Sequence, residues 1–155
     1  MLTLMSLIDE LRPELELMAG HKSIQLTYTT KGSASTKIKT DSLIVKEVIT
    51  NLVSNAIKYT PDGGSVGLEV KPRKSDVLLH VIDSGWGIPK LSHDQVFSKF
   101  FRAQNIVKKE TTGTGLGLYL VKGLLDELGG KIWFESSEDG GTSFFFTLPR
   151  SIKAK

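Results

Sequence analysis

The chain of 155 residues contains no cysteine, which excludes a disulfide scaffold, a zinc ribbon, an iron–sulfur site and a thiol nucleophile. It also lacks an apolar run that approaches the roughly 18–20 residues needed to span a bilayer. A large excess of one charge is absent as well, because 20 basic residues stand against 17 acidic ones and leave a formal net charge of +3. So small an excess calls for no nucleic-acid partner.

The remaining composition is that of one globular domain. Hydrophobic residues make up 39% of the chain and charged residues 24%, a balance that favours neither disorder nor a membrane bundle. A chain of this length buries roughly 70% of its unfolded surface, so the core needs no cross-link or structural metal. The first ten residues lack the basic start of a signal peptide and carry two acids after a short apolar stretch. We therefore expect a helix there.

The repeat of apolar residues predicts alternating helices and strands. Spacings of three and four predict a first helix over residues 4–18, which is either kinked at Pro13 or best formed from it onward. They also predict a long helix from residue 41 or 42 to about 59, and a third helix over residues 115–128. The predicted strands cover residues 24–28, a short piece around 38, 66–70, 77–82, 132–134 and 143–148.

The order of these elements indicates the fold class. Hairpin and crossover connections are mixed, which favours an α/β (α+β) two-layer sandwich over a doubly wound fold. Residues 83–114 show no regular periodicity, and so long a segment in a compact domain is a functional lid or a disordered stretch. We expect residues 1–20 to be a leading helix of the domain, residues 21–150 its body and residues 151–155 a frayed tail.

Three polar side chains mark one face of the long helix. Asn51, Asn55 and Lys58 are spaced four and three apart, so they lie on the side opposite the aliphatic residues. Amide oxygens can join the octahedron of a magnesium ion without adding charge, and an ammonium group can neutralise phosphate. The face therefore suits a magnesium polyphosphate, although an ordinary solvated helix face has the same pattern.

An acidic residue directly follows the apolar strand over 77–82. This residue is Asp83, and Gly85 and Gly87 come after it. A carboxylate at the end of a buried strand needs a donor. The amino group of adenine supplies one, whereas the carbonyl of guanine would set a second acceptor against it. Glycines let a flat ring approach the backbone closely. The alternative is an ordinary Asp–Gly turn.

A run of glycines opens the third helix. Backbone N–H groups at a helix N-terminus form an anion site, and glycines allow close approach. A Walker A loop would need Gly-Lys-Ser/Thr after the last glycine and a Rossmann loop would follow a strand directly, so neither fits. A helix start without a ligand remains the alternative. The run consists of Gly113, Thr114, Gly115, Leu116, Gly117 and Leu118.

Taken in order, these stretches resemble the N, G1 and G2 boxes of the catalytic ATP-binding domain of two-component sensor histidine kinases. The F box of that family has its match in Phe97-x-x-Phe100-Phe101-Arg102. These kinases belong with the gyrase, Hsp90 and MutL ATPases in the GHKL superfamily, and the resemblance covers roughly residues 7–149. It implies the Bergerat-type ATP-binding fold, in which helices cover one face of a mixed β-sheet and ATP lies under a mobile lid, here roughly residues 90–114.

The resemblance also implies roles for single residues. Asn55 would coordinate Mg²⁺ with help from Asn51, and Asp83 would accept a hydrogen bond from the adenine amino group. Arg102 would reach the γ-phosphate, and Thr142 would reach the base through water. Catalytic roles fall to Asn55, Lys58 and Arg102. The implied ATP-binding residues are Asn51, Asn55, Lys58, Tyr59, Asp83, Gly85, Gly87, Ile88, Arg102, Gly113, Thr114, Gly115, Leu116, Gly117, Leu118 and Thr142.

The activity implied by the resemblance is that of a protein histidine kinase with ATP and Mg²⁺ as cofactors. Such a domain transfers the γ-phosphoryl group to a histidine on a dimerisation/phosphoacceptor domain. None of His21, His80 and His93 resembles the acceptor box of the family, so we expect that domain to be a partner outside this chain. A response regulator would be an indirect partner and the location cytoplasmic. We expect no nucleic acid and no direct membrane contact.

Two alternatives share the fold: a nucleotide-binding sensor module without kinase activity, and a serine kinase of the anti-sigma type. The F box favours the histidine kinase over the serine kinase. Gyrase-like and Hsp90-like ATPases place a glutamate base four residues before the metal-binding asparagine, where this chain has Asn51. Glu47 lies one turn further back, too far by motif position. We therefore expect slow ATP hydrolysis.

Overall fold

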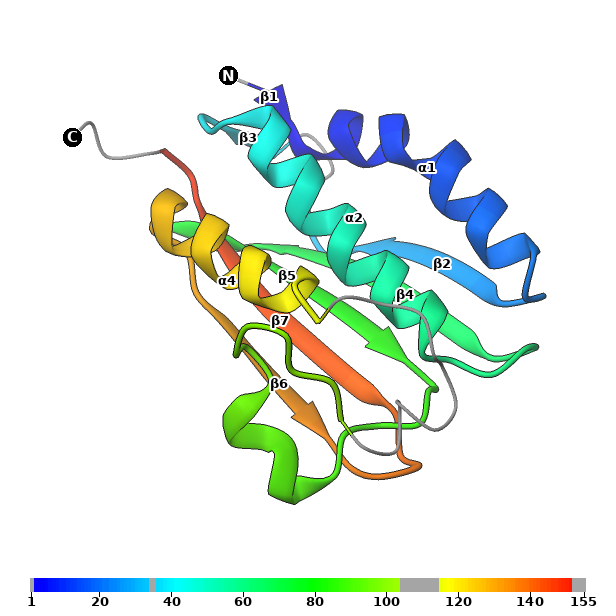
Figure 1. The fold of residues 1–155 in the computed structure, drawn as a ribbon. Helices are drawn as coiled ribbons and strands as arrows, with labels where there is room; N and C mark the ends of the chain where they lie inside the picture. The colour runs from blue at the N-terminus through cyan, green and yellow to red at the C-terminus, as the bar shows by residue number, and fades with distance from the viewer. Residues whose placement is uncertain (1, 34–35, 104–114, 152–155) are drawn as a thin grey trace.

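The computed structural model describes residues 2–33, 36–103 and 115–151. It has two layers, with the helices α1, α2 and α4 packed over one face of a five-stranded sheet (Figure 1). The strands are β1 (Leu2–Thr3), β2 (Gln25–Thr30), β3 (Lys37–Ile38), β4 (Ser65–Pro72), β5 (Asp76–Asp83), β6 (Ile132–Ser136) and β7 (Thr142–Pro149). The helices are α1 (Leu4–Gly20), α2 (Ser42–Lys58), the 3₁₀ helix η1 (Lys90–Gln95) and α4 (Gly117–Leu128).

The sheet is mixed, as the connections predict, and its strand order is β2-β4-β5-β7-β6. β2 and β4 are parallel, and α2 is the crossover between them. The other pairs are antiparallel, including the predicted hairpins β4–β5 and β6–β7. The register of β5 on β7 sets Asp83 opposite Thr142. Two residues 59 positions apart in sequence are therefore neighbours at one end of the sheet.

The core lies between the helices and the sheet, and α2 carries much of it. Asp41 begins this helix as predicted, because its Oδ1 accepts from the N–H groups of Leu43 at 2.9 Å and Ile44 at 3.2 Å. The inner side of α2 is apolar, and each fully buried aliphatic side chain contributes about 1.5–3 kcal/mol. Its buried residues are Val45, Val48, Ile49, Leu52, Val53, Ala56 and Ile57.

Helix α1 runs without interruption through Pro13. The sequence left open whether the helix kinks at this proline or is best formed from it onward. Leu11 and Leu15, on either side of Pro13, are both buried against the core. Their burial holds the helix together across the hydrogen bond that proline cannot donate.

Several element boundaries differ from the prediction by one or more residues, and one strand was not predicted. The third helix begins at Gly117 and not at residue 115, because Gly115 has a positive φ of 71° that no helix accommodates. Ser151, expected in the tail, forms a parallel β-bridge with Lys39. The two-residue strand β1 was not predicted, since a pair of residues shows no periodicity. Within the described ranges, no helix is both long and apolar enough to cross a bilayer.

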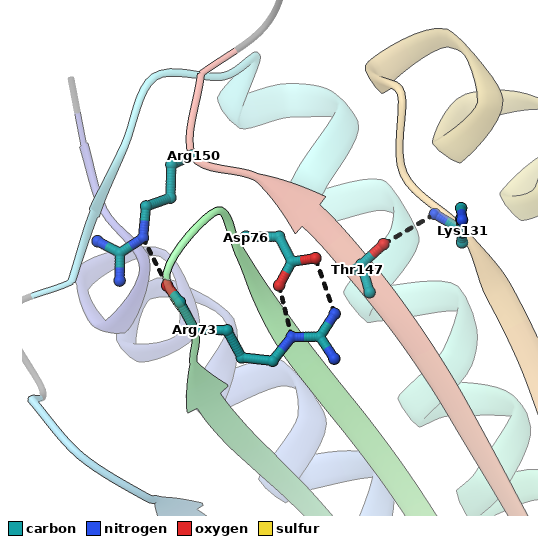
Figure 2. A network of polar contacts seen from close by, with 5 residues as sticks. All are labelled: Arg73, Asp76, Lys131, Thr147 and Arg150. Atoms are coloured by element: carbon teal, nitrogen blue, oxygen red, sulfur yellow. Dashed lines mark hydrogen bonds and ion pairs between the residues drawn. The ribbon is translucent and has the colours of Figure 1, made fainter.

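The end of the sheet that holds the start of β5 is closed by polar contacts (Figure 2). Arg73 donates from Nε and Nη2 to the two carboxylate oxygens of Asp76, at 2.6 and 2.7 Å. This bidentate pair holds the pKa of Asp76 below its usual value. Arg150 Nε donates to the carbonyl oxygen of Arg73 at 2.9 Å, which ties the end of β7 to the β4–β5 turn.

Candidate functional site

A cleft of about 450 Å³ opens between α2, the start of α4, the end of β5 and the start of β7. It receives side chains from all four sequence motifs. A second hollow of about 400 Å³ lies at the other end of the sheet, beside Arg73 and Asp76. None of the motifs contributes to that hollow, so the first cleft is the candidate site.

Helix α2 forms the first wall, where Asn51, Asn55, Lys58 and Tyr59 line the cleft. The two asparagines face the start of α4, because a Cβ atom added to Gly117 would lie 3.2 Å from Asn51 Oδ1 and 3.4 Å from Asn55 Nδ2. Lys58 Nζ is 5.5 Å from the centre of the Tyr59 ring, within the range of a cation–π contact. The predicted polar face of the helix therefore borders the cleft.

The orientation of the Asn51 amide suits a metal ion. Its Nδ2 donates to the backbone oxygen of Glu47 at 2.9 Å and to Glu47 Oε1 at 3.0 Å. Both N–H groups are thus used on the helix itself, and Oδ1 is turned toward Gly117. A neutral amide oxygen is a ligand that Mg²⁺ accepts beside phosphate oxygens and water. In the described ranges no three His, Asp or Glu side chains cluster to hold a metal by themselves.

Asp83 ends β5 at the floor of the cleft. Its Oδ1 accepts from the N–H groups of Gly85 at 2.8 Å and Thr142 at 3.2 Å. Burial raises the pKa of this carboxyl to about 6, and the two N–H groups act in the opposite direction. No described residue donates to Oδ2. The carboxylate thus has one oxygen fixed by the fold and one available for a ligand.

Gly85 was expected to line the base pocket, but it is not among the residues that line the cleft. It lies behind the carboxylate instead. A Cβ atom added to it would be 2.4 Å from the Tyr59 carbonyl oxygen and 2.7 Å from Asp83 Oδ1, so only glycine fits the turn. Gly87 and Ile88 do line the cleft.

Thr142 lines the cleft and connects Asp83 to a hydroxyl that sequence reasoning missed. Ser136 Oγ donates to the Gly141 carbonyl oxygen at 3.0 Å and accepts from Ile88 N at 2.8 Å. Since its single proton is committed, Thr142 Oγ1 donates to it across 2.7 Å. Ser136 lies in no motif. Only its pairing with Thr142 across the β6–β7 hairpin could have identified it.

The start of α4 forms the wall opposite the asparagines, and Gly115, Leu116, Gly117 and Leu118 line the cleft there. The N-cap residue Leu116 makes no side-chain cap hydrogen bond. The first N–H groups of a helix have no partner within the helix and carry its positive dipole end. This wall has the chemistry that an anion would need. Gly113 and Thr114, expected to contribute, lie outside the described residues.

The F box contributes Arg102 and Phe101 to the cleft. Phe97 packs in the other direction, edge-on against Phe134 and Phe144 with ring centres 5.9 and 6.3 Å apart. This contact fixes the start of the box on the β6–β7 hairpin. Arg102 lines the cleft, as does Lys58, the other cation of the predicted set.

The three histidines lie outside the cleft lining. His80 is stacked on Phe145 within the sheet, with ring centres 4.2 Å apart. His93 Nε2 is 2.9 Å from the Ile88 carbonyl oxygen, and its ring packs edge-on against Phe134. His21 follows the last residue of α1.

Comparisons with known proteins agree with this geometry. Residues 40–152 match the family described as "Histidine kinase-, DNA gyrase B-, and HSP90-like ATPase". The sensor histidine kinase WalK of Bacillus subtilis (strain 168) is 38% identical over 114 residues, which are 72% of this chain and 19% of WalK. The signal transduction histidine-protein kinase BarA of Escherichia coli (strain K12) is 33% identical over 150 residues, 94% of this chain and 16% of BarA. The chain thus spans less than a fifth of these two relatives.

Solved structures give the same result at the scale of the domain. The catalytic domain of histidine kinase ThkA superposes with a TM-score of 0.84 and 31% identity, covering 98% of this chain and 95% of that one. ThkA in complex with the response regulator protein TrrA matches with a TM-score of 0.79 and 28% identity, over 99% of this chain and 42% of ThkA. Its mixed sheet, its one-sided helices and its motif-lined cleft place this chain in the histidine kinase-, DNA gyrase B- and HSP90-like ATPase family, with the fold of a sensor histidine kinase catalytic domain.

Proposed function

We propose that this chain is the ATP-binding catalytic domain of a sensor histidine kinase in two-component signal transduction. It binds Mg–ATP and transfers the γ-phosphoryl group to a histidine of a dimerisation/phosphoacceptor domain. The observation that carries this proposal is the half-buried Asp83 carboxylate, which has Oδ1 fixed by two backbone N–H groups and Oδ2 left for a ligand. An acceptor in this state selects a purine that presents an amino group.

The rest of the cleft suits the remaining parts of ATP. Ile88 and Phe144 give apolar surface beside Asp83 for the base. The start of α4 and the Lys58 ammonium offer positive charge to the phosphates. Asn51 and Asn55 would hold Mg²⁺, which when bound neutralises charge on the phosphates. Arg102 provides a second cation for the transferred group.

Phosphoryl transfer asks the protein mainly for positioning and for neutralisation of charge. The bond between the γ-phosphorus and the bridging oxygen breaks, and a bond from the γ-phosphorus to an imidazole nitrogen forms. ADP leaves, and the imidazole ring gives up its N–H proton to solvent. Asp83 orients the base and Lys58 and Arg102 neutralise the moving charge, so the chain prepares the reaction while the partner domain brings the nucleophile.

Slow hydrolysis is part of the same proposal. Where gyrase-like ATPases have a glutamate base, this chain has Asn51, and Glu47 is engaged with the Asn51 amide. Among the described residues of α2, neither Asn51 nor Glu47 is therefore placed to act as that base. We place the domain in the cytoplasm, where ATP is available, with the phosphoacceptor domain as direct partner and a response regulator as indirect partner.

A transfer assay tests the proposal. The chain is mixed with its cognate phosphoacceptor domain and γ-labelled ATP, and phosphohistidine is detected as acid-labile, base-stable label on the acceptor. We expect label with wild type and none with Asp83→Asn. Brisk ATP turnover without phosphohistidine would contradict a kinase role. Phosphoserine on a small partner protein would instead identify a serine kinase.

A further inference from the structure

Lys22 belongs to none of the sequence motifs, yet its ammonium group reaches the end of α2. The residue lies between α1 and β2. Its Nζ donates to the carbonyl oxygens of Ile57 at 2.9 Å, Lys58 at 2.9 Å and Thr60 at 2.6 Å. A lysine ammonium has three donors and no acceptor. Its whole hydrogen-bonding capacity is therefore spent at this one place.

The place is electrostatically suited to a cation. The last carbonyl groups of a helix have no partner within it, and they form the negative end of its dipole. The Asn55 carbonyl accepts from Tyr59 N at 2.9 Å, and the Ala56 carbonyl accepts from Thr60 Oγ1 at 2.7 Å. Lys22 supplies donors and positive charge to the carbonyls that follow.

The same lysine also joins this helix end to its surroundings. Its own carbonyl oxygen accepts from Gly63 N at 2.9 Å, in the turn after α2. Its Nζ lies 5.9 Å from the ring centre of Trp86, and Trp86 N donates to the Tyr59 carbonyl oxygen at 3.2 Å. The end of α2 and the segment after Asp83 are thus held around one ammonium group.

We propose that Lys22 is a positioning residue of the nucleotide site. By binding the carbonyls of Ile57, Lys58 and Thr60, its ammonium fixes the backbone from which the Lys58 and Tyr59 side chains project into the cleft. Lys22 itself is not among the residues that line the cleft. It therefore acts through Lys58 and Tyr59 and not on the nucleotide. The inference rests on the proposed function, because it takes Mg–ATP as the ligand.

The absence of cysteine allows a direct test. Lys22→Cys provides a single thiol, which can be alkylated in denaturant with 2-bromoethylamine and the protein then refolded. The product carries an ammonium group at nearly the reach of lysine. Alkylation with 1-bromopropane gives a side chain of similar length without donors or charge. Affinity for a non-hydrolysable ATP analogue with Mg²⁺ is measured by calorimetry for both products.

We expect the propylated protein to bind the analogue about tenfold more weakly than wild type, and the aminoethylated protein to bind it within about twofold. Equal affinity of the two products would overturn the proposal. Lys46→Cys is the matched control, because Lys46 lies on α2 and its ammonium pairs with Glu10 on α1. Either alkyl group at residue 46 should leave affinity unchanged.

A second variant covers the case in which the propylated chain fails to fold. Lys22→Arg keeps the positive charge at the helix end, but the planar guanidinium cannot direct three donors at the same three carbonyls. We expect a folded protein with weakened affinity, and wild-type affinity in this variant would overturn the proposal. If wild type binds no ATP analogue at all, the proposed function itself fails. If wild type binds the ATP analogue and the two alkylated proteins bind it with equal affinity, only the role of Lys22 is contradicted.

Discussion

At the scale of single residues, the Asp83 carboxylate is suited to binding a ligand but lowers the stability of the fold at neutral pH. Burial raises the pKa of its carboxyl from 3.8 to about 6. Because the folded-state pKa lies above the unfolded value, stability from this group is full below about pH 4 and is lost as the pH rises through about 6. At neutral pH the protein holds an ionised carboxylate that weakens the fold. The side chain is better explained by ligand binding than by folding.

Asp83→Asn should therefore stabilise the nucleotide-free protein. The rise of the pKa from 3.8 to about 6 predicts a gain of about 2–3 kcal/mol in the free energy of unfolding at pH 7.5. Urea denaturation at pH 7.5 and pH 4 measures it, and the gain should largely vanish at pH 4. If the amide oxygen takes over the N–H groups of Gly85 and Thr142, its NH₂ group faces the adenine amino group, and nucleotide binding should be lost. An unchanged or reduced stability at pH 7.5 would contradict this account.

Nucleotide affinity should also depend on pH. Protonation removes the charge that strengthens the hydrogen bond from adenine, so affinity should fall by up to about tenfold per pH unit below about pH 6. Calorimetric titrations with ADP between pH 5 and 8 measure the change. The titration of the phosphates also contributes, and a parallel series with Asp83→Asn isolates the part due to the carboxyl. Profiles of the same shape for both proteins would rule out Asp83 as the titrating group.

Glu47 should affect the binding of Mg²⁺ more than the binding of the adenine ring. Its Oε1 accepts from Asn51 Nδ2 at 3.0 Å and helps to keep the amide oxygen turned to the cleft. Glu47→Leu should reduce the gain in nucleotide affinity that Mg²⁺ brings, by about three- to tenfold. Glu47→Gln retains an acceptor and should behave like wild type. The readout is the ratio of affinities with Mg²⁺ and with EDTA, and equal ratios in all three proteins would show that Glu47 plays no such part.

At the scale of elements, two glycines of α4 differ in their surroundings, because Gly117 lies close to the asparagines of the cleft and Gly123 does not. A Cβ atom at Gly117 would lie 3.2 Å from Asn51 Oδ1, whereas nothing lies within 4 Å of one at Gly123. Gly123→Ala should stabilise the helix by about 0.5–1 kcal/mol without changing affinity. Gly117→Ala should weaken Mg–nucleotide binding at least about tenfold, because the asparagine amides must move. Thermal melts measure the change in stability, and calorimetry measures the change in affinity. Equal nucleotide affinities of the two variants would contradict the prediction.

The same scale shows where sequence reasoning succeeds. Helices and strands with several turns or alternations, such as α2 and β4, were predicted because their apolar residues repeat with a fixed period. The β1–β3 pair is only two residues long, so the sequence of β1 shows no periodic pattern from which a strand could be predicted. The start of α4 was misplaced because the positive φ of Gly115 depends on the close contact with Phe100, which is tertiary.

At the scale of the whole molecule, most of the site followed from residue type and spacing. The Asn51–Asn55–Lys58 face, Asp83 and the glycines of α4 converge as expected on one cleft. Ser136 and the place of Gly85 behind the carboxylate could not be foreseen, because both depend on the meeting of β5, β7 and β6. Short-range patterns identify the side chains that line the cleft, while the groups that support them are set by strand pairing.

The leading helix is predicted to be indispensable to the domain. Leu4, Ile8, Leu11 and Leu15 of α1 are all buried in the common core. Each buried side chain contributes about 1.5–3 kcal/mol, and a domain has only about 5–15 kcal/mol of net stability. A chain that starts at residue 21 should therefore show no cooperative melt by circular dichroism. Leu17→Ala, at an exposed position of the same helix, should melt within a few degrees of wild type.

Helix α2 buries one side in the core and turns the other toward the cleft. A ligand held by its polar side restrains the same backbone that supports the hydrophobic interior. The amide protons of this helix should therefore exchange with deuterated solvent more slowly once the cleft is filled, even at positions that no ligand atom touches. One segment of this chain thus reports occupancy without any attached label.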